Sequence, residues 1–140
     1  MKFKKLNSGY ILKLEKGEEI IETLAKFCGD NNIKSGSIAG IGGTDNATLK
    51  YYDREKKEYI PKNFSGKDYE IVSLLGNISL IDGKAFAHIH ITLGDVDYNT
   101  FGGHLGSAVV SITCEMTISM TGGILNRKLD DEFKLNFLDI

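Results

Sequence analysis

Residues 69–93 read YEIVSLLGNISLIDGKAFAHIHITL, two runs of alternating apolar and polar residues separated by Asp82-Gly83. An Asp-Gly pair between such runs is the typical signal of a two-residue hairpin turn. A turn at that point sets His88 opposite Asn77, with His90 two positions further along the same strand. In this register the apolar residues of both strands fall on one face. The segment therefore predicts an antiparallel β-hairpin that buries one face in the core.

Further strands are predicted on both sides of this hairpin. Alternating or small-residue runs predict them at 9–15, 37–43, 46–53, 57–64, 107–120 and 133–138. We expect residues 37–43 to run into a turn, and residues 46–53 and 57–64 to form an exposed hairpin. The chain has 16 glycines and one proline, and its glycines fall between these runs, as expected for turns and bulges in a β-rich protein.

One helix is predicted, opening at Gly17 and ending at a Gly29 C-cap. Glu18 and Glu19 suit its N-terminus because the helix macrodipole favours negative charge there. Apolar residues then recur on one helical stripe: Ile20, Ile21, Leu24, Phe27 and Cys28. The sequence thus predicts the α+β class, with a mainly antiparallel β-sheet and one major helix in a single domain spanning residues 1–140.

Composition places the chain among ordinary globular proteins. It has 140 residues, of which 41% are hydrophobic and 26% charged. No apolar run approaches the roughly 20 residues needed to cross a bilayer, so no membrane association is expected. The first residues, MKFKK, lead into alternating sequence instead of an apolar signal core. Two distant cysteines form no CxxC pair, and together these features predict a reduced, cytoplasmic protein.

The charge balance disfavours direct binding to DNA. The formal net charge is −2, whereas proteins that grip phosphates usually carry a basic excess or stripe. The lysines are scattered, and the one short basic cluster, residues 54–58, is interrupted by acidic residues.

All three histidines of the chain lie within a short stretch, His88 and His90 in a strand and His104 after a Gly102-Gly103 pair. Strand residues two apart share a face, so His88 and His90 project together. A His-x-His pair plus a distant histidine is the ligand set of zinc sites that keep one open position. Other transition metals also accept imidazole. The alternative is that His88 and His90 merely occupy a half-polar sheet face and His104 a turn.

Several other polar residues are candidates to support that site. Glu115, in the strand at 107–120, is expected opposite an apolar series that includes Ile112. It is either a buried, hydrogen-bonded acid, a partner of a metal-bound histidine, or a solvated or interface carboxylate. Asn77 shares the histidine face of the hairpin. Asp95 could reach a bound metal or small ligand, but turn aspartates are more often simply turn formers. Residues 40–43 fit no phosphate-binding loop pattern.

The sheet face that carries the histidines also carries apolar residues. Phe86, Leu75 and Tyr69 are expected on it, and a single helix covers only one face of a sheet. Mixed faces of this kind are often closed by another subunit, so the sequence predicts an oligomer.

The chain resembles the plant-and-prokaryote-conserved (PPC) domain family over nearly all of its length. The segments that carry the resemblance are Tyr69–Asn77, Ala87–His90 and Gly102–Gly106, supported by Tyr10–Glu19 and Ile112–Met116. The resemblance implies an α/β domain with an antiparallel sheet that assembles as a homotrimer. It also implies a metal ion, zinc in the first instance, held by His88, His90 and His104. In land plants this domain follows AT-hook segments that bind DNA, and this sequence has no Arg-Gly-Arg-Pro hook.

Three functional hypotheses follow. The first is a homotrimeric PPC-domain protein with a three-histidine metal site, acting as a binding or regulatory module and not as an enzyme. The second is a zinc-dependent hydrolase or lyase that uses the open metal position, with Glu115 or Asp95 as proton acceptor. The third is a DNA-binding transcriptional regulator.

Overall fold

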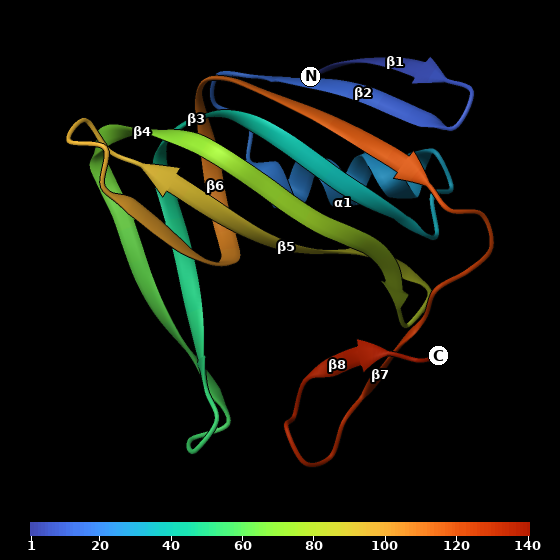
Figure 1. Ribbon diagram of the computed structural model, residues 1–140. Coiled ribbons are helices and arrows are strands. Elements are labelled where there is room, and N and C mark those ends of the chain that lie inside the picture. Colours follow the sequence, from blue (N-terminus) through green and yellow to red (C-terminus); the bar gives the residue numbers. More distant parts are fainter.

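In the computed structural model, which describes all 140 residues, six strands form one antiparallel sheet and a short hairpin lies beside it (Figure 1). The elements in chain order are β1 Lys2–Leu6, β2 Gly9–Glu15, α1 Ile20–Asp30, β3 Gly36–Asp53, β4 Glu58–Ile81, β5 Lys84–Gly94, β6 Thr100–Met120, β7 Arg127–Leu129 and β8 Asn136–Leu138. The sheet order is β1-β2-β6-β3-β4-β5, and β7 pairs with β8. β5 also pairs with the first part of β6, so the ring β6-β3-β4-β5 closes on itself.

The hairpin of residues 69–93 has the predicted turn and register. β4 and β5 are antiparallel, with His88 opposite Asn77 and His90 opposite Leu75. Asp82 and Gly83 both have positive φ, 49° and 75°, as a type I′ turn requires. The register slips only near the far end of the hairpin, at a bulge between Ile71 and Ser73. Beyond this bulge Tyr69 is buried in the core, so its expected place on the histidine face is wrong.

The helix α1 covers one face of the sheet, and the core lies between them (Figure 1). It begins at Ile20, later than the predicted start at Gly17, because Glu19 caps it by accepting a hydrogen bond from the Glu22 backbone N–H at 2.6 Å. It continues one residue past the predicted end, to Asp30. Its buried residues are those of the predicted stripe: Ile20, Leu24, Phe27 and Cys28, with Ile21 partly buried.

The strand expected at residues 37–43 is confirmed, but the turn expected at its end is wrong, because β3 continues to Asp53. Glycine serves there for close packing: a Cβ atom on Gly42 would lie 2.7 Å from the Cα of Cys114 on β6. The expected hairpin of 46–53 and 57–64 is confirmed as the far ends of β3 and β4, with Tyr52 opposite Tyr59.

Alternation along β6 breaks at a bulge, which corrects the expected position of one residue. The pairing of β3 with β6 shifts between Gly42 and Thr44, and on β6 both Val110 and Ser111 are buried. Ile112, which strict alternation places in the core, is therefore 75% exposed. The strand predicted at 133–138 is shorter, and β1 and β7 were not predicted from the sequence.

No helix in the structure is both long enough and apolar enough to span a lipid bilayer.

Candidate metal centre

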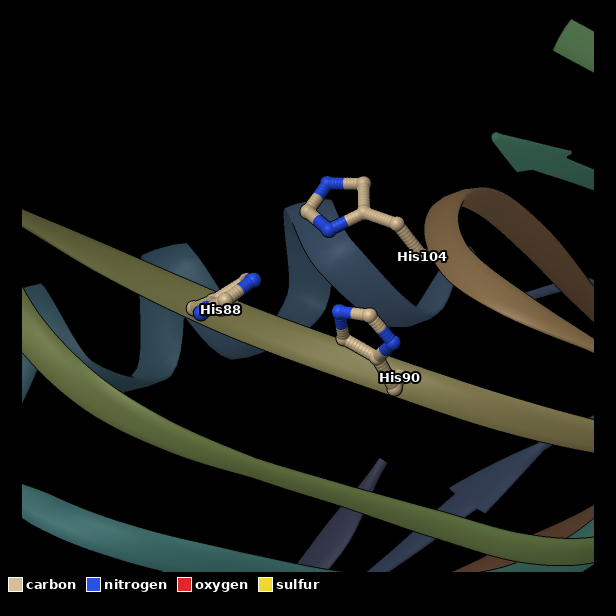
Figure 2. A group of neighbouring side chains, drawn as sticks. All are labelled: His88, His90 and His104. Atoms are coloured by element: carbon tan, nitrogen blue, oxygen red, sulfur yellow. The ribbon is translucent and has the colours of Figure 1, made fainter. Parts of the chain in front are cut away.

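The three histidines meet where β5 pairs with β6. His90 on β5 lies directly opposite His104 on β6, and His88 is two residues before His90 on the same face. One ligand atom from each side chain lies within 4.8 Å of the other two. Figure 2 shows the three rings turned toward one another, and their centroids are 5.2 to 5.5 Å apart. The expected His-x-His plus distant His set is thus brought together in space.

Local sequence explains how each histidine reaches this position. Ile89 and Ile91 are buried in the core, so His88 and His90 point to the opposite face of β5. His104 is not a turn residue, because it lies within β6. The preceding Gly103 lets that strand pass close to β3: a Cβ atom there would lie 3.2 Å from the backbone oxygen of Lys50.

Burial lowers the pKa of two of the three histidines, His88 and His104. Burial is the main cause that lowers the pKa of His104, to about 4, and the nearby His88 and His90 lower it further. Burial and then the Arg127 guanidinium lower the pKa of His88. The Tyr59 ring stacks on His104 with a centroid distance of 5.0 Å. Neutral imidazole is the form that binds a metal ion, so His88 and His104 are in the binding form near neutral pH.

The hydrogen bonding of His104 is also consistent with a metal ligand. The Nδ1 atom of His104 is buried and has no hydrogen-bond partner in the protein, which is costly for a buried polar atom. Three convergent imidazoles are a donor set that zinc and neighbouring transition metals accept. The group at His88, His90 and His104 is therefore suited to hold a metal ion.

Arg127, at the start of β7, is a site residue that the sequence did not reveal. Its Nη2 donates to Asn77 Oδ1 at 2.8 Å and lies 3.4 Å from His88 Nδ1. Its guanidinium also lies over the Phe86 ring, 5.3 Å from the centroid. The residues around Arg127 form no recognisable motif. Arg127 lies beside the histidines because the chain after β6 folds back along the end of β4, where the Leu80 backbone N–H donates to the Leu125 carbonyl at 2.8 Å.

The three other predicted site residues lie at different distances from the histidines. Asn77 is linked to the site through Arg127. Asp95 instead closes its own loop: its carboxylate accepts from the backbone N–H groups of Asp97 and Asn99, both at 3.0 Å.

Glu115 also lies away from the histidines. It is exposed on β6 and lines a groove with Glu70. Neither Asp95 nor Glu115 belongs to the group of residues whose ligand atoms converge.

A cavity of about 310 Å³ opens beside the histidines, between the sheet and the β7–β8 segment. Figure 1 shows the C-terminal hairpin set apart from the sheet, and the Tyr52 hydroxyl ties it to the long β3–β4 arm by donating to the Phe133 carbonyl oxygen. The lining residues are Tyr59, Phe86, His88, His104, Arg127, Lys134, Leu135, Asn136 and Phe137. No aspartate or glutamate is among them.

Comparison with known proteins now identifies the family. The model of the Plants and Prokaryotes Conserved (PCC) domain matches residues 1–121. The chain belongs to this family. The resemblance to the PPC family is thereby confirmed, while Arg127 and the β7–β8 hairpin lie beyond the matched residues of this PPC chain. No curated protein is similar enough in sequence to count as a match.

Several solved structures are similar to this PPC chain. A protein from Bacteroides thetaiotaomicron, called a "putative DNA binding protein", has 34% identity and a TM-score of 0.95, covering 99% of this chain and 96% of its own. A protein from Archaeoglobus fulgidus, called metal-containing, has 34% identity and a TM-score of 0.87, with both chains fully covered. A PPC protein from Pyrococcus horikoshii has 32% identity and a TM-score of 0.86, covering 99% of this chain and 96% of its own.

Proposed function

We propose that this PPC protein is a metal-dependent binding or regulatory module. Its metal ion, with zinc as the first candidate, is held by His88, His90 and His104. The observation that carries the proposal is the convergence of three imidazoles, one with a buried nitrogen that has no other partner. The similar protein from A. fulgidus, called metal-containing, supports it. When bound, zinc supplies a Lewis acid with an open coordination position.

Elemental analysis of protein purified without a metal-affinity tag tests this proposal. We expect about one zinc per chain, because three histidines form one ligand set. The His88→Ala/His90→Ala variant should lose the metal and stay folded, since both side chains lie outside the core cluster. Glu115→Gln is the matched control and should keep the metal. Protein that takes up no metal, even when zinc is offered, contradicts the proposal.

We also propose that the chain assembles as a homotrimer. An oligomer is supported by exposed apolar residues on the sheet face away from the helix: Ile41, Val72 and Ile112 line one groove there. The number three rests on the family resemblance. Sedimentation equilibrium should give three times the chain mass of 15.4 kDa for the wild-type protein. The Ile112→Lys variant should sediment with the mass of a single chain. Val96→Lys is the control, because Val96 is 80% exposed in a loop. Wild-type protein that sediments as a monomer refutes this assembly.

A metal-dependent enzyme is the second candidate, and the cavity beside the histidines favours it. The proton acceptors considered from the sequence, Glu115 and Asp95, are not in that cavity, and no other carboxylate lines it. This is why binding ranks above catalysis here. Zinc-dependent turnover in a hydrolase and lyase screen, lost in His88→Ala/His90→Ala, would reverse the order.

Direct DNA binding ranks last, although the similar B. thetaiotaomicron protein carries a DNA-binding name. The net charge of −2 provides no excess of cations for phosphates. In a DNA-shift titration we expect no salt-dependent complex; a complex that weakens steeply with salt would support this function instead.

A further inference from the structure

The cavity beside the histidines contains a guanidinium without a carboxylate partner. Arg127 is half-buried and forms no ion pair with any residue of the chain. All its hydrogen-bond acceptors are neutral: the Ser79 hydroxyl, the Asn136 carbonyl and the Asn77 side-chain oxygen. A charge removed from water is costly unless it is paired, so this position favours an anion.

Those three hydrogen bonds fix the orientation of the guanidinium and leave donors free. Arginine has five N–H groups, of which Nε donates to Ser79 at 2.7 Å, Nη1 to Asn136 at 2.7 Å and Nη2 to Asn77 at 2.8 Å. One N–H on each Nη atom is left, and the contact of Nη2 with His88 Nδ1 at 3.4 Å is longer than an ordinary hydrogen bond. An anion in the cavity can therefore accept from Arg127 without breaking its bonds to the fold.

Lys134 provides a second cation in the same cavity. Its nearest acidic partner is Asp131, 3.7 Å away and almost fully exposed, so the pair is weak. Its charge is thus free to act on a bound anion.

The rest of the cavity wall suits an apolar, uncharged part of a ligand. Tyr59, Phe86 and Phe137 present aromatic surface, and the volume of about 310 Å³ is at the small end of ligand sites. That size suits a small organic acid better than a nucleotide or a peptide.

We infer that this cavity binds a small organic carboxylate, with its charged group at Arg127 and Lys134 and its apolar body against the aromatic wall. The inference deepens the proposed function and rests on it in one respect: a metal ion at the adjacent histidines would add positive charge to the same space. No carboxylate of the protein lines the cavity to compete with the ligand.

Isothermal titration of the full-length protein with benzoate tests the inference, in zinc-loaded and metal-free form, after zinc content has been measured. We expect benzoate to bind and the neutral isostere benzamide to bind at least about tenfold more weakly, since a charge-assisted hydrogen bond is lost. Arg127→Gln and Lys134→Gln should each weaken benzoate binding, Arg127→Gln by about tenfold or more. Lys128→Gln is the matched control, because Lys128 is exposed on the same hairpin and does not line the cavity.

The outcomes separate this inference from the metal proposal. Stoichiometric zinc with no benzoate binding overturns the carboxylate site and leaves the metal centre standing. Benzoate binding to a protein that never takes up zinc supports the carboxylate site and contradicts the metal centre. Inorganic phosphate binding more tightly than benzoate overturns the choice of an organic acid. If Arg127→Gln loosens the C-terminal hairpin, Lys134→Gln still decides the matter, since Lys134 makes no side-chain hydrogen bond within the fold, and benzoate affinity unchanged in that variant refutes the inference.

Discussion

Replacing Gly76 with alanine should disturb both the fold and the histidine site. Gly76 lies on β4 opposite Ile89, next to His88 on β5. A Cβ atom there would lie well under 3.0 Å from the His88 carbonyl oxygen and 3.0 Å from the Ile89 Cα. Because both of these are backbone atoms of a paired strand, β5 must shift as a whole. The segment that moves is the one carrying His88 and His90.

The size of the effect follows from two opposing contributions. Overpacking costs up to about 3 kcal/mol, and contact with backbone on a paired strand places this site at the upper end of that range. Alanine also lowers the conformational entropy of the unfolded chain, which stabilises the folded state by about 0.4–1 kcal/mol. We therefore expect the free energy of unfolding to fall by about 2 kcal/mol, together with a zinc affinity weakened by about tenfold as the histidines lose their relative positions.

Urea unfolding followed by circular dichroism, at one protein concentration, measures the first quantity, and competition with a chelator measures the second. Gly29→Ala is the matched control, since a Cβ atom there meets nothing within 4 Å and the residue is helical. That variant should be as stable as the wild type or slightly more stable. A Gly76→Ala protein with wild-type stability and zinc affinity refutes the reasoning.

The remaining predictions concern pH, the core and one loop. The pKa of His104 is lowered in the folded state to about 4, so between pH 6.5 and 4 the unfolded chain binds protons that the folded chain does not. The metal-free protein should therefore be most stable above pH 6.5 and lose stability as the pH falls toward 4, and the urea midpoint of His104→Asn should depend less on pH. Equal pH dependence in both proteins would refute this. Leu24→Ala removes a fully buried helix side chain and should cost about 2–5 kcal/mol, measured by urea unfolding, with metal content per folded chain unchanged. Asp95→Ala should lower the melting temperature by a few degrees, because two backbone N–H groups and Lys67 lose their acceptor. Loss of zinc in Asp95→Ala would show instead that this loop acts on the metal centre.

Local patterns were enough to predict several elements. The β4–β5 register follows from Asp82-Gly83, because a two-residue turn leaves only one pairing. The buried stripe of α1 follows from helical periodicity. The shared face of His88 and His90 follows from the two-residue period of a strand.

Errors arose where bulges or long-range pairing override local pattern. Ile112 is exposed because the bulge in β6 turns it outward locally, although Val110 and Cys114 on either side keep the predicted burial, and strict alternation cannot anticipate such an irregularity. The glycines at 40–43 resemble a turn in sequence but allow close strand packing inside β3.

From the sequence, the β-hairpin, the helix, the family and the shared face of His88 and His90 could be predicted, and the family resemblance also implied that His104 joins them. The folded chain was needed to bring the three rings together, to place Arg127 of the C-terminal hairpin beside them and to keep Glu115 away. The difference lies in the sequence separation over which each feature is set. Side-chain direction follows from backbone geometry over two to four residues, whereas the meeting of β5, β6 and β7 depends on which distant strands pair and where their registers slip.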